Sequence, residues 1–184
     1  MNIPAIAFVG KQNSGKTVLL EKLIAALSAD DIKVGTLKHH SHAGFNFDVE
    51  GKDSWRHAQA GSRFSVINAP DKIAMVRLLD APLPADETIA AMIALSVADT
   101  NTQRLDIILV EGYRHAGLPT IELFRAANPN DAERELGSED NDVIAVITDI
   151  ERIVAAAAAA SPPLPCFGFD DIDELAGFLK GIIR

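Results

Sequence analysis

The sequence predicts an α/β fold in which a mostly parallel sheet carries helices on both faces, with a peripheral antiparallel portion. Short apolar runs rich in β-branched residues alternate along the chain with segments of helical periodicity. This alternation is typical of parallel sheets with helices on both faces. With 184 residues, 48% of them hydrophobic, and no internal repeat or linker, we expect residues 1–184 to form a single domain.

The first half of the chain begins with an apolar run and then repeats apolar residues at helical spacing. Further on, two β-rich runs flank the turn Ala69-Pro70-Asp71-Lys72, and Asp86 precedes another helical pattern, where we expect it to act as the cap. We expect strands at 3–9, 32–37, 63–68 and 73–79, and helices at 18–27, 52–60 and 85–98.

The second half contains three more apolar runs, an alanine run stopped by prolines, and a closing helical pattern. Alanine favours helix through its propensity. We expect the strands that begin at Ile73 and Thr120 to be antiparallel or peripheral. The expected strands are 106–110, 120–124, 143–147 and a short one ending at Phe167 and Phe169, and the helices are 155–160 and 171–183.

A phosphate-binding motif lies between the first strand and the first helix. Its strand-loop-helix context matches what G-x-x-x-x-G-K-[ST] requires, and a chance match in such a chain is roughly 1 in 100 or less. Backbone amides and the helix dipole there favour an anion. We therefore expect a three-layer P-loop NTPase fold that binds a nucleoside triphosphate. The motif residues are Gly10, Lys11, Gln12, Asn13, Ser14, Gly15, Lys16 and Thr17.

Two charged residues at strand ends complete the expected phosphate site. In this motif the lysine, Lys16, reaches the β- and γ-phosphates, and the hydroxyl of Thr17 ligates Mg²⁺. Glu111 follows the buried run at 107–110, where a P-loop protein places a second acidic residue, and Lys38 ends another strand and can neutralise phosphate. Because ligands bind beyond the carboxyl ends of parallel strands, we expect these groups to converge, with Lys16 and Glu111 as catalytic residues.

A third metal ligand is expected in the loop after the second strand. Asp48 and Asp53 are the candidates, and we choose Asp48 because Asp53 lies at a helix start, where the dipole also explains an acid. The metal ligands are therefore Thr17, Asp48 and Glu111. The nearby histidines 39, 40 and 42 fit no standard zinc spacing, so we expect them to contact phosphate or lie at the surface. Arg56 and Arg63 are candidates for contacting substrate anions, but we expect them to be solvated.

The net charge of −9 argues against a general nucleic-acid or membrane-surface role, since both favour a basic face. No signal peptide and no apolar stretch long enough to span a bilayer is visible, so we expect a cytoplasmic protein. The single cysteine, Cys166, is expected to be a small buried hydrophobe.

Four segments together resemble a known family, the molybdopterin-guanine dinucleotide biosynthesis protein B (MobB) family. They are the phosphate motif, Lys38-His39-His40-Ser41-His42, Phe47-Asp48-x-x-Gly51-Lys52-Asp53-Ser54-x-Arg56-x-x-x-Ala60-Gly61, and Val110-Glu111-Gly112-Tyr113.

The resemblance implies a GTP-binding protein that is a weak GTPase and usually a homodimer. Such a protein assists the guanylyltransferase partner that attaches GMP to molybdopterin. The resemblance places residues 10–17 at the phosphates of GTP, and Thr17, Asp48 and Glu111 at Mg²⁺. Lys11 is not usual at its position in the family and is similar to the signature lysine of dimeric ATPases with a deviant phosphate loop.

The base and the functional class stay open at the level of the sequence. The guanine-reading Asn-Lys-x-Asp segment is absent, and Asp149 either accepts from the guanine N1 and N2 hydrogens or caps a helix. Two other functions compete with the assisting role that the resemblance implies. One is an ATP-dependent enzyme resembling dethiobiotin synthetase, and the other is a nucleotide-switched metal-delivery chaperone that uses the histidines.

Overall fold

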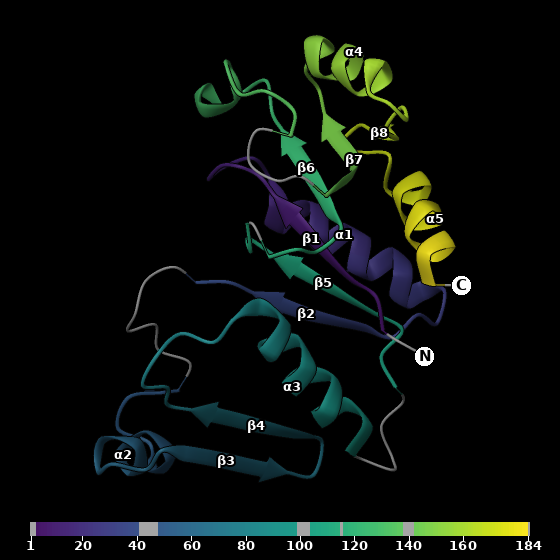
Figure 1. Ribbon diagram of the computed structural model, residues 1–184. Helices are drawn as coiled ribbons and strands as arrows, with labels where there is room; N and C mark the ends of the chain where they lie inside the picture. Colours follow the sequence, from purple (N-terminus) through teal and green to yellow (C-terminus); the bar gives the residue numbers. More distant parts are fainter. Residues whose placement is uncertain (1–2, 41–47, 99–103, 115, 138–141, 184) are drawn as a thin grey trace. The chain divides into compact units, whose positions relative to one another are not determined.

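The computed structural model describes residues 3–40, 48–98, 104–114, 116–137 and 142–183 (Figure 1). The described residues divide into two compact units. Those within Met1–His39 and Ala85–Arg184 form the larger one, here called the sheet unit. Those within His40–Pro84 form the smaller one, here called the hairpin unit. Each unit is described by itself.

The sheet unit is built on six parallel strands in the order β2-β5-β1-β6-β7-β8. Because every strand runs the same way, all carboxyl ends meet at one edge, with β1 between β5 and β6 (Figure 1). The strands are β1 Ala5–Val9, β2 Val34–Lys38, β5 Ile107–Glu111, β6 Thr120–Phe124, β7 Val143–Thr148 and β8 Cys166–Phe167.

Helices cover both faces of this sheet, which confirms the predicted layering. Helices α1 (Lys16–Ala29) and α5 (Ile172–Ile183) pack through Leu23 and Leu179 against a cluster that includes Phe8. On the other face, α3 (Ala85–Ala98) and α4 (Glu151–Ala159) bring Ile89 and Ile153 into two separate clusters. Alternate strand residues point to opposite faces, so each strand contributes to both layers.

The prediction that the strand at Thr120 is antiparallel or peripheral is wrong. Strand β6 lies between β1 and β7, is parallel to both, and all five of its residues are buried. Its polar side chains are accommodated inside the sheet because each has a partner. Thr120 Oγ1 donates to Leu118 O (2.9 Å), and buried Glu122 is paired with Arg134 (3.1 Å).

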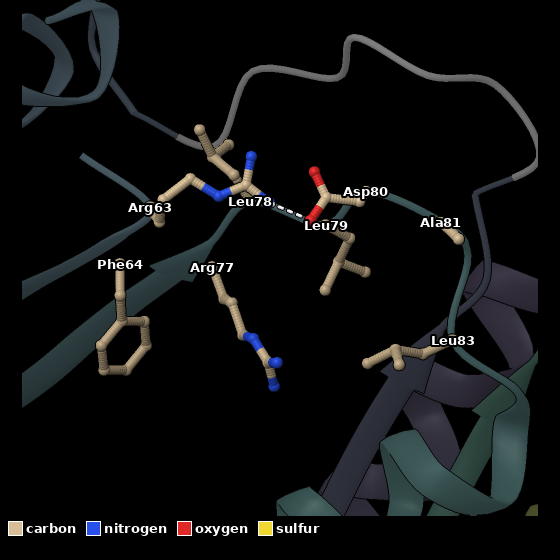
Figure 2. Close-up of a pocket in the computed structure, with 8 residues that line it drawn as sticks. All are labelled: Arg63, Phe64, Arg77, Leu78, Leu79, Asp80, Ala81 and Leu83. Atoms are coloured by element: carbon tan, nitrogen blue, oxygen red, sulfur yellow. Dashed lines mark ion pairs between the residues drawn. The ribbon is translucent and has the colours of Figure 1, made fainter. Parts of the chain in front are cut away.

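The hairpin unit contains the predicted antiparallel portion. Strands β3 (Phe64–Ala69) and β4 (Lys72–Arg77) pair in antiparallel register around a turn at Pro70 and Asp71, next to helix α2 (Asp53–Gln59). A cavity of about 580 Å³ lies beside the hairpin, lined by Leu78, Leu79 and two arginines among others (Figure 2). Arg63, expected to be solvated, pairs there with Asp80 (2.6 Å).

Two smaller differences concern the C-terminal part of the sheet unit. Cys166 is exposed, so its prediction as a buried residue is wrong, because β8 has only two residues and borders the sheet. Helix α4 begins at Glu151, ahead of the alanine run. Among the described residues, no helix has the length and apolar character needed to cross a bilayer.

Candidate functional site

The loop between β1 and α1 is a tight turn at the carboxyl edge of the sheet. Asn13 (φ 65°) and Gly15 (φ 84°) both adopt the left-handed conformation, and helix α1 starts at Lys16 directly behind them. At Gly10, a Cβ atom would lie 2.7 Å from Ser14 Oγ and 3.1 Å from Leu123 O, so only glycine fits. The loop thus presents a helix N-terminus whose first amides lack helical acceptors, which favours an anion.

Lys16 folds back over this loop. Its Nζ donates to Gly10 O (2.9 Å), Lys11 O (2.8 Å) and Ser14 Oγ (3.2 Å). Desolvation by burial lowers the pKa of Lys16, with the charge of Glu111 acting in the opposite direction. The cation is therefore held at the mouth of the loop by neutral oxygens, and an entering phosphate would supply the missing countercharge.

Three predicted residues meet beside the loop. The Oγ1 of Thr17 donates to Glu111 Oε1 (3.3 Å), and Lys38 Nζ lies 3.4 Å from Glu111 Oε2. The parallel register places them there, since Glu111 stands opposite Phe8 of β1 and opposite Lys38 of β2. The Glu111 side chain is 16% exposed, so this carboxylate faces the site from a largely buried strand end.

The donor set around Glu111 fits magnesium. A hydroxyl and a carboxylate are hard oxygen ligands, and Mg²⁺ commonly uses one or two carboxylates, substrate phosphates and water. The described residues hold no group of three or more His, Cys, Asp or Glu side chains arranged for a metal ion. Asp48 lies in the hairpin unit, where its Oδ1 accepts from Val49 N (2.7 Å), and its role at the metal stays a prediction.

The histidines take different positions. The His39 ring lies 4.3 Å from that of Tyr113, and its backbone amide donates to Glu111 O (2.9 Å). His40 is exposed, and His42 lies outside the described residues. His39 thus extends the pairing of β2 with β5 beyond Lys38.

Asp149 follows β7 and is not a helix cap. The N-cap of α4 is Ile150, whose amide donates to Thr148 Oγ1 (3.0 Å). One oxygen of Asp149 accepts from Ala126 N (2.6 Å), and the other lies 3.8 Å from Arg125 Nε. Its carboxylate therefore supports the segment after β6, and its contact with guanine stays a prediction.

The structure adds residues that the sequence analysis missed. Arg114 Nη2 donates to Gly10 O (3.3 Å), and Asn128 Nδ2 donates to Gln12 O (3.0 Å). Arg125 directly follows β6 at the carboxyl edge of the sheet. Because ligands bind at this edge, its position after the predicted strand 120–124 was a signal that it could belong to the site. Nothing local in the sequence points to Asn128, which is 116 positions from its partner.

A buried ionic network holds the segment that carries Asn128. Arg134 pairs with Glu122 and with Asp131 (3.1 Å each), and these side chains are at most 4% exposed. The other oxygen of Asp131 accepts from Arg125 N and Asn128 Nδ2 (3.1 Å each). The network therefore fixes the loop after β6 against the phosphate loop.

The sheet, the loop and the helix behind it define the class of P-loop α/β proteins. The chain belongs to the MobB family, since the family model described as molybdopterin guanine dinucleotide synthesis protein B matches residues 5–149. This confirms the family that the sequence motifs indicated.

Related proteins support the assignment. The Escherichia coli K12 protein described as a molybdopterin-guanine dinucleotide biosynthesis adapter protein is 35% identical over 177 residues, covering 96% of this chain and 91% of its own. The Haemophilus influenzae adapter protein is 36% identical over 147 residues, covering 80% of this chain and 75% of its own. The crystal structure of Bacillus subtilis MobB superposes with a TM-score of 0.73 at 24% identity, covering 98% of each chain, and shows the same fold.

Proposed function

We propose that this protein is an adapter of molybdopterin-guanine dinucleotide biosynthesis that binds GTP with Mg²⁺ at its phosphate loop. The adapter role follows from family membership and from relatives that match over most of their length. The observation that carries the nucleotide is the loop itself, with Lys16 bent over it and Thr17 and Glu111 paired beside it.

Residues of the loop and residues beside it are proposed to bind different parts of the Mg-GTP complex. Residues Gly10 to Thr17 surround the terminal phosphates, to which Lys16 and Lys38 bring positive charge. Thr17 and Glu111 would hold Mg²⁺, with Asp48 as a further ligand. When bound, the metal neutralises charge on the transferred phosphoryl group. Lys16 and Glu111 would then support a slow hydrolysis, which makes the protein a weak GTPase.

The choice of guanine is proposed to depend on Asp149. A carboxylate at the end of β7 can accept from the N1 and N2 hydrogens of guanine, which adenine does not present in that arrangement. Family membership supports the same choice. The partners proposed are a guanylyltransferase that attaches GMP to molybdopterin, molybdopterin itself, and a second copy of this chain in a homodimer.

A competition titration with magnesium tests the proposal. GTP and ATP would each displace a fluorescent GTP analogue from the full-length protein, and we expect GTP to compete at lower concentration. Equal or stronger competition by ATP would contradict the guanine assignment and favour an ATP-dependent enzyme. Displacement by neither nucleotide would contradict nucleotide binding altogether.

A further inference from the structure

A cavity of about 410 Å³ opens beside the phosphate loop, within the sheet unit. Asn13, Gly15 and Val18 line it from the loop and the start of α1. Arg125, which follows β6, and Phe169, which follows β8, line it from the other side. The cavity therefore continues directly from the surface expected to hold phosphate.

The sheet order places this cavity and the strand ends that carry Glu111 and Lys38 on opposite sides of β1. Glu111 and Lys38 end β5 and β2, which lie on one side of β1, whereas β6, β7 and β8 lie on the other (Figure 1). A nucleotide whose terminal phosphates lie beside Glu111 and whose chain crosses the loop would reach the cavity with its base. Val18, directly after the last motif residue, is 58% exposed and offers apolar surface on that path.

The far wall of the cavity suits a flat aromatic ring. The Arg125 guanidinium carbon lies over the Phe169 ring, 4.2 Å from its centre, so a cation–π contact is already made there. Phe169 also packs against the main core cluster. Arg125 is fixed through its amide, which donates to Asp131 (3.1 Å), and through Asp149 at 3.8 Å from its Nε. A wall held in this way is preorganised for stacking.

The rim of the cavity supplies polar groups for the edge of such a ring. Lys22 of α1 and Asp170 lie there as an ion pair 2.9 Å apart. They offer a donor and an acceptor, which is what the polar edge of a nucleobase requires.

We infer that this cavity is the nucleobase site, in which the Arg125–Phe169 pair stacks on the ring, while Lys22 and Asp170 meet polar groups of the base other than the guanine N1 and N2 hydrogens proposed above for Asp149. The inference rests on the proposed nucleotide binding and extends it, because it assigns the base to side chains outside the phosphate motif. It predicts that affinity for the base and affinity for the phosphates can be separated by substitution.

The test compares Mg-GTP with inorganic tripolyphosphate, which has no base, by calorimetric titration of the full-length protein. Phe169→Leu keeps apolar volume for the core but removes the aromatic ring. We expect its affinity for Mg-GTP to fall about 10-fold while its affinity for tripolyphosphate stays unchanged, since stacking acts on the base alone. Phe169→Tyr keeps the ring and should restore GTP binding.

Phe167→Leu is the matched control, because Phe167 contacts Phe178 (ring centres 5.7 Å apart) and does not line the cavity. It should leave the ratio of the two affinities unchanged. Equal losses for GTP and tripolyphosphate in Phe169→Leu, or no loss, would overturn the base site. So would a wild type that binds tripolyphosphate as tightly as GTP. Failure of the wild type to bind either probe would instead overturn the proposed function.

Discussion

At the residue scale, the strand register determines which groups surround Glu111. The carboxylate meets the Thr17 hydroxyl on one oxygen and the Lys38 ammonium on the other, at 3.3 and 3.4 Å. The strand that ends at Glu111 is buried along its first four residues, so the charge emerges only at the site. A solvated surface glutamate would not be held between two residues of the proposed nucleotide site.

Replacing this carboxylate tests its role at the metal. Glu111→Gln keeps the size of the side chain and removes its charge, so the apparent Mg²⁺ affinity in the GTP complex should fall, and slow hydrolysis should fall with it. Nucleotide affinity without metal should survive or rise, because phosphate repulsion is relieved. Magnesium titrations of GTP binding give the result, with Glu151→Gln, at an exposed position at the start of α4, as control. Superimposable curves for wild type and Glu111→Gln would exclude a metal role.

Lys16 gives the site a predictable pH dependence. Burial lowers the pKa of Lys16 in the free protein, and a bound phosphate should raise it again. Above the lowered pKa, binding must therefore take up a proton, so affinity for ATP should fall as the pH rises through it. ATP is the suitable probe, because its phosphates are already ionised at alkaline pH and adenine, unlike guanine, has no ring N1–H that ionises there. Lys16→Arg, which stays protonated, should flatten the profile; a flat wild-type profile would contradict this explanation.

At the scale of elements, the loop after β6 holds the phosphate loop in place through a hydrogen bond, and β6 anchors that loop through an ionic network. Buried Arg134 joins Glu122 of β6 to Asp131, and Asn128 joins that loop to Gln12. The strand thus carries an ionic network through the core of the sheet.

Removing the Arg134 cation should destabilise the folded protein. Arg134→Ala leaves Glu122 and Asp131 buried without their partner, and the free energy of unfolding should fall by about 3–5 kcal/mol. Urea denaturation followed by circular dichroism measures it. Arg104→Ala, at an exposed position before β5, is the control. A loss below about 1 kcal/mol, the level of surface pairs, would show that the network contributes little to stability.

The sequence predicted those elements whose local pattern and tertiary environment agree. The strand, loop and helix around the phosphate motif were predicted because glycines, β-branched residues and helical spacing all point the same way. The burial of β6 inside the parallel sheet depends on the pairing of Glu122 with Arg134, twelve positions later, which no local pattern shows. The contacts of Asn128 with Gln12 and of Phe169 with Arg125 were missed for the same reason, since only the folded sheet brings these residues together.

At the scale of the whole molecule, strand order organises the proposed site. The phosphate loop follows β1 near the middle of the sheet, with Glu111 and Lys38 toward β2 and the proposed base site toward β8. Alternating strands and helices predicted this α/β class from the sequence. The single domain over residues 1–184 stays a prediction, and no composition change or linker in the sequence marks the boundaries of the two compact units at His40 and Pro84.

The central claim is that the loop at residues 10–17 binds the phosphates of a nucleotide. Calorimetric titration of Mg-GTP into wild type and Lys16→Ala tests it most directly. Loss of the charged donor should weaken binding at least about 10-fold, while the circular dichroism spectrum and melting temperature stay close to those of wild type. Lys33→Ala, a lysine paired with exposed Asp31 beyond the far end of α1, should bind like wild type. Unchanged affinity in Lys16→Ala would contradict the account.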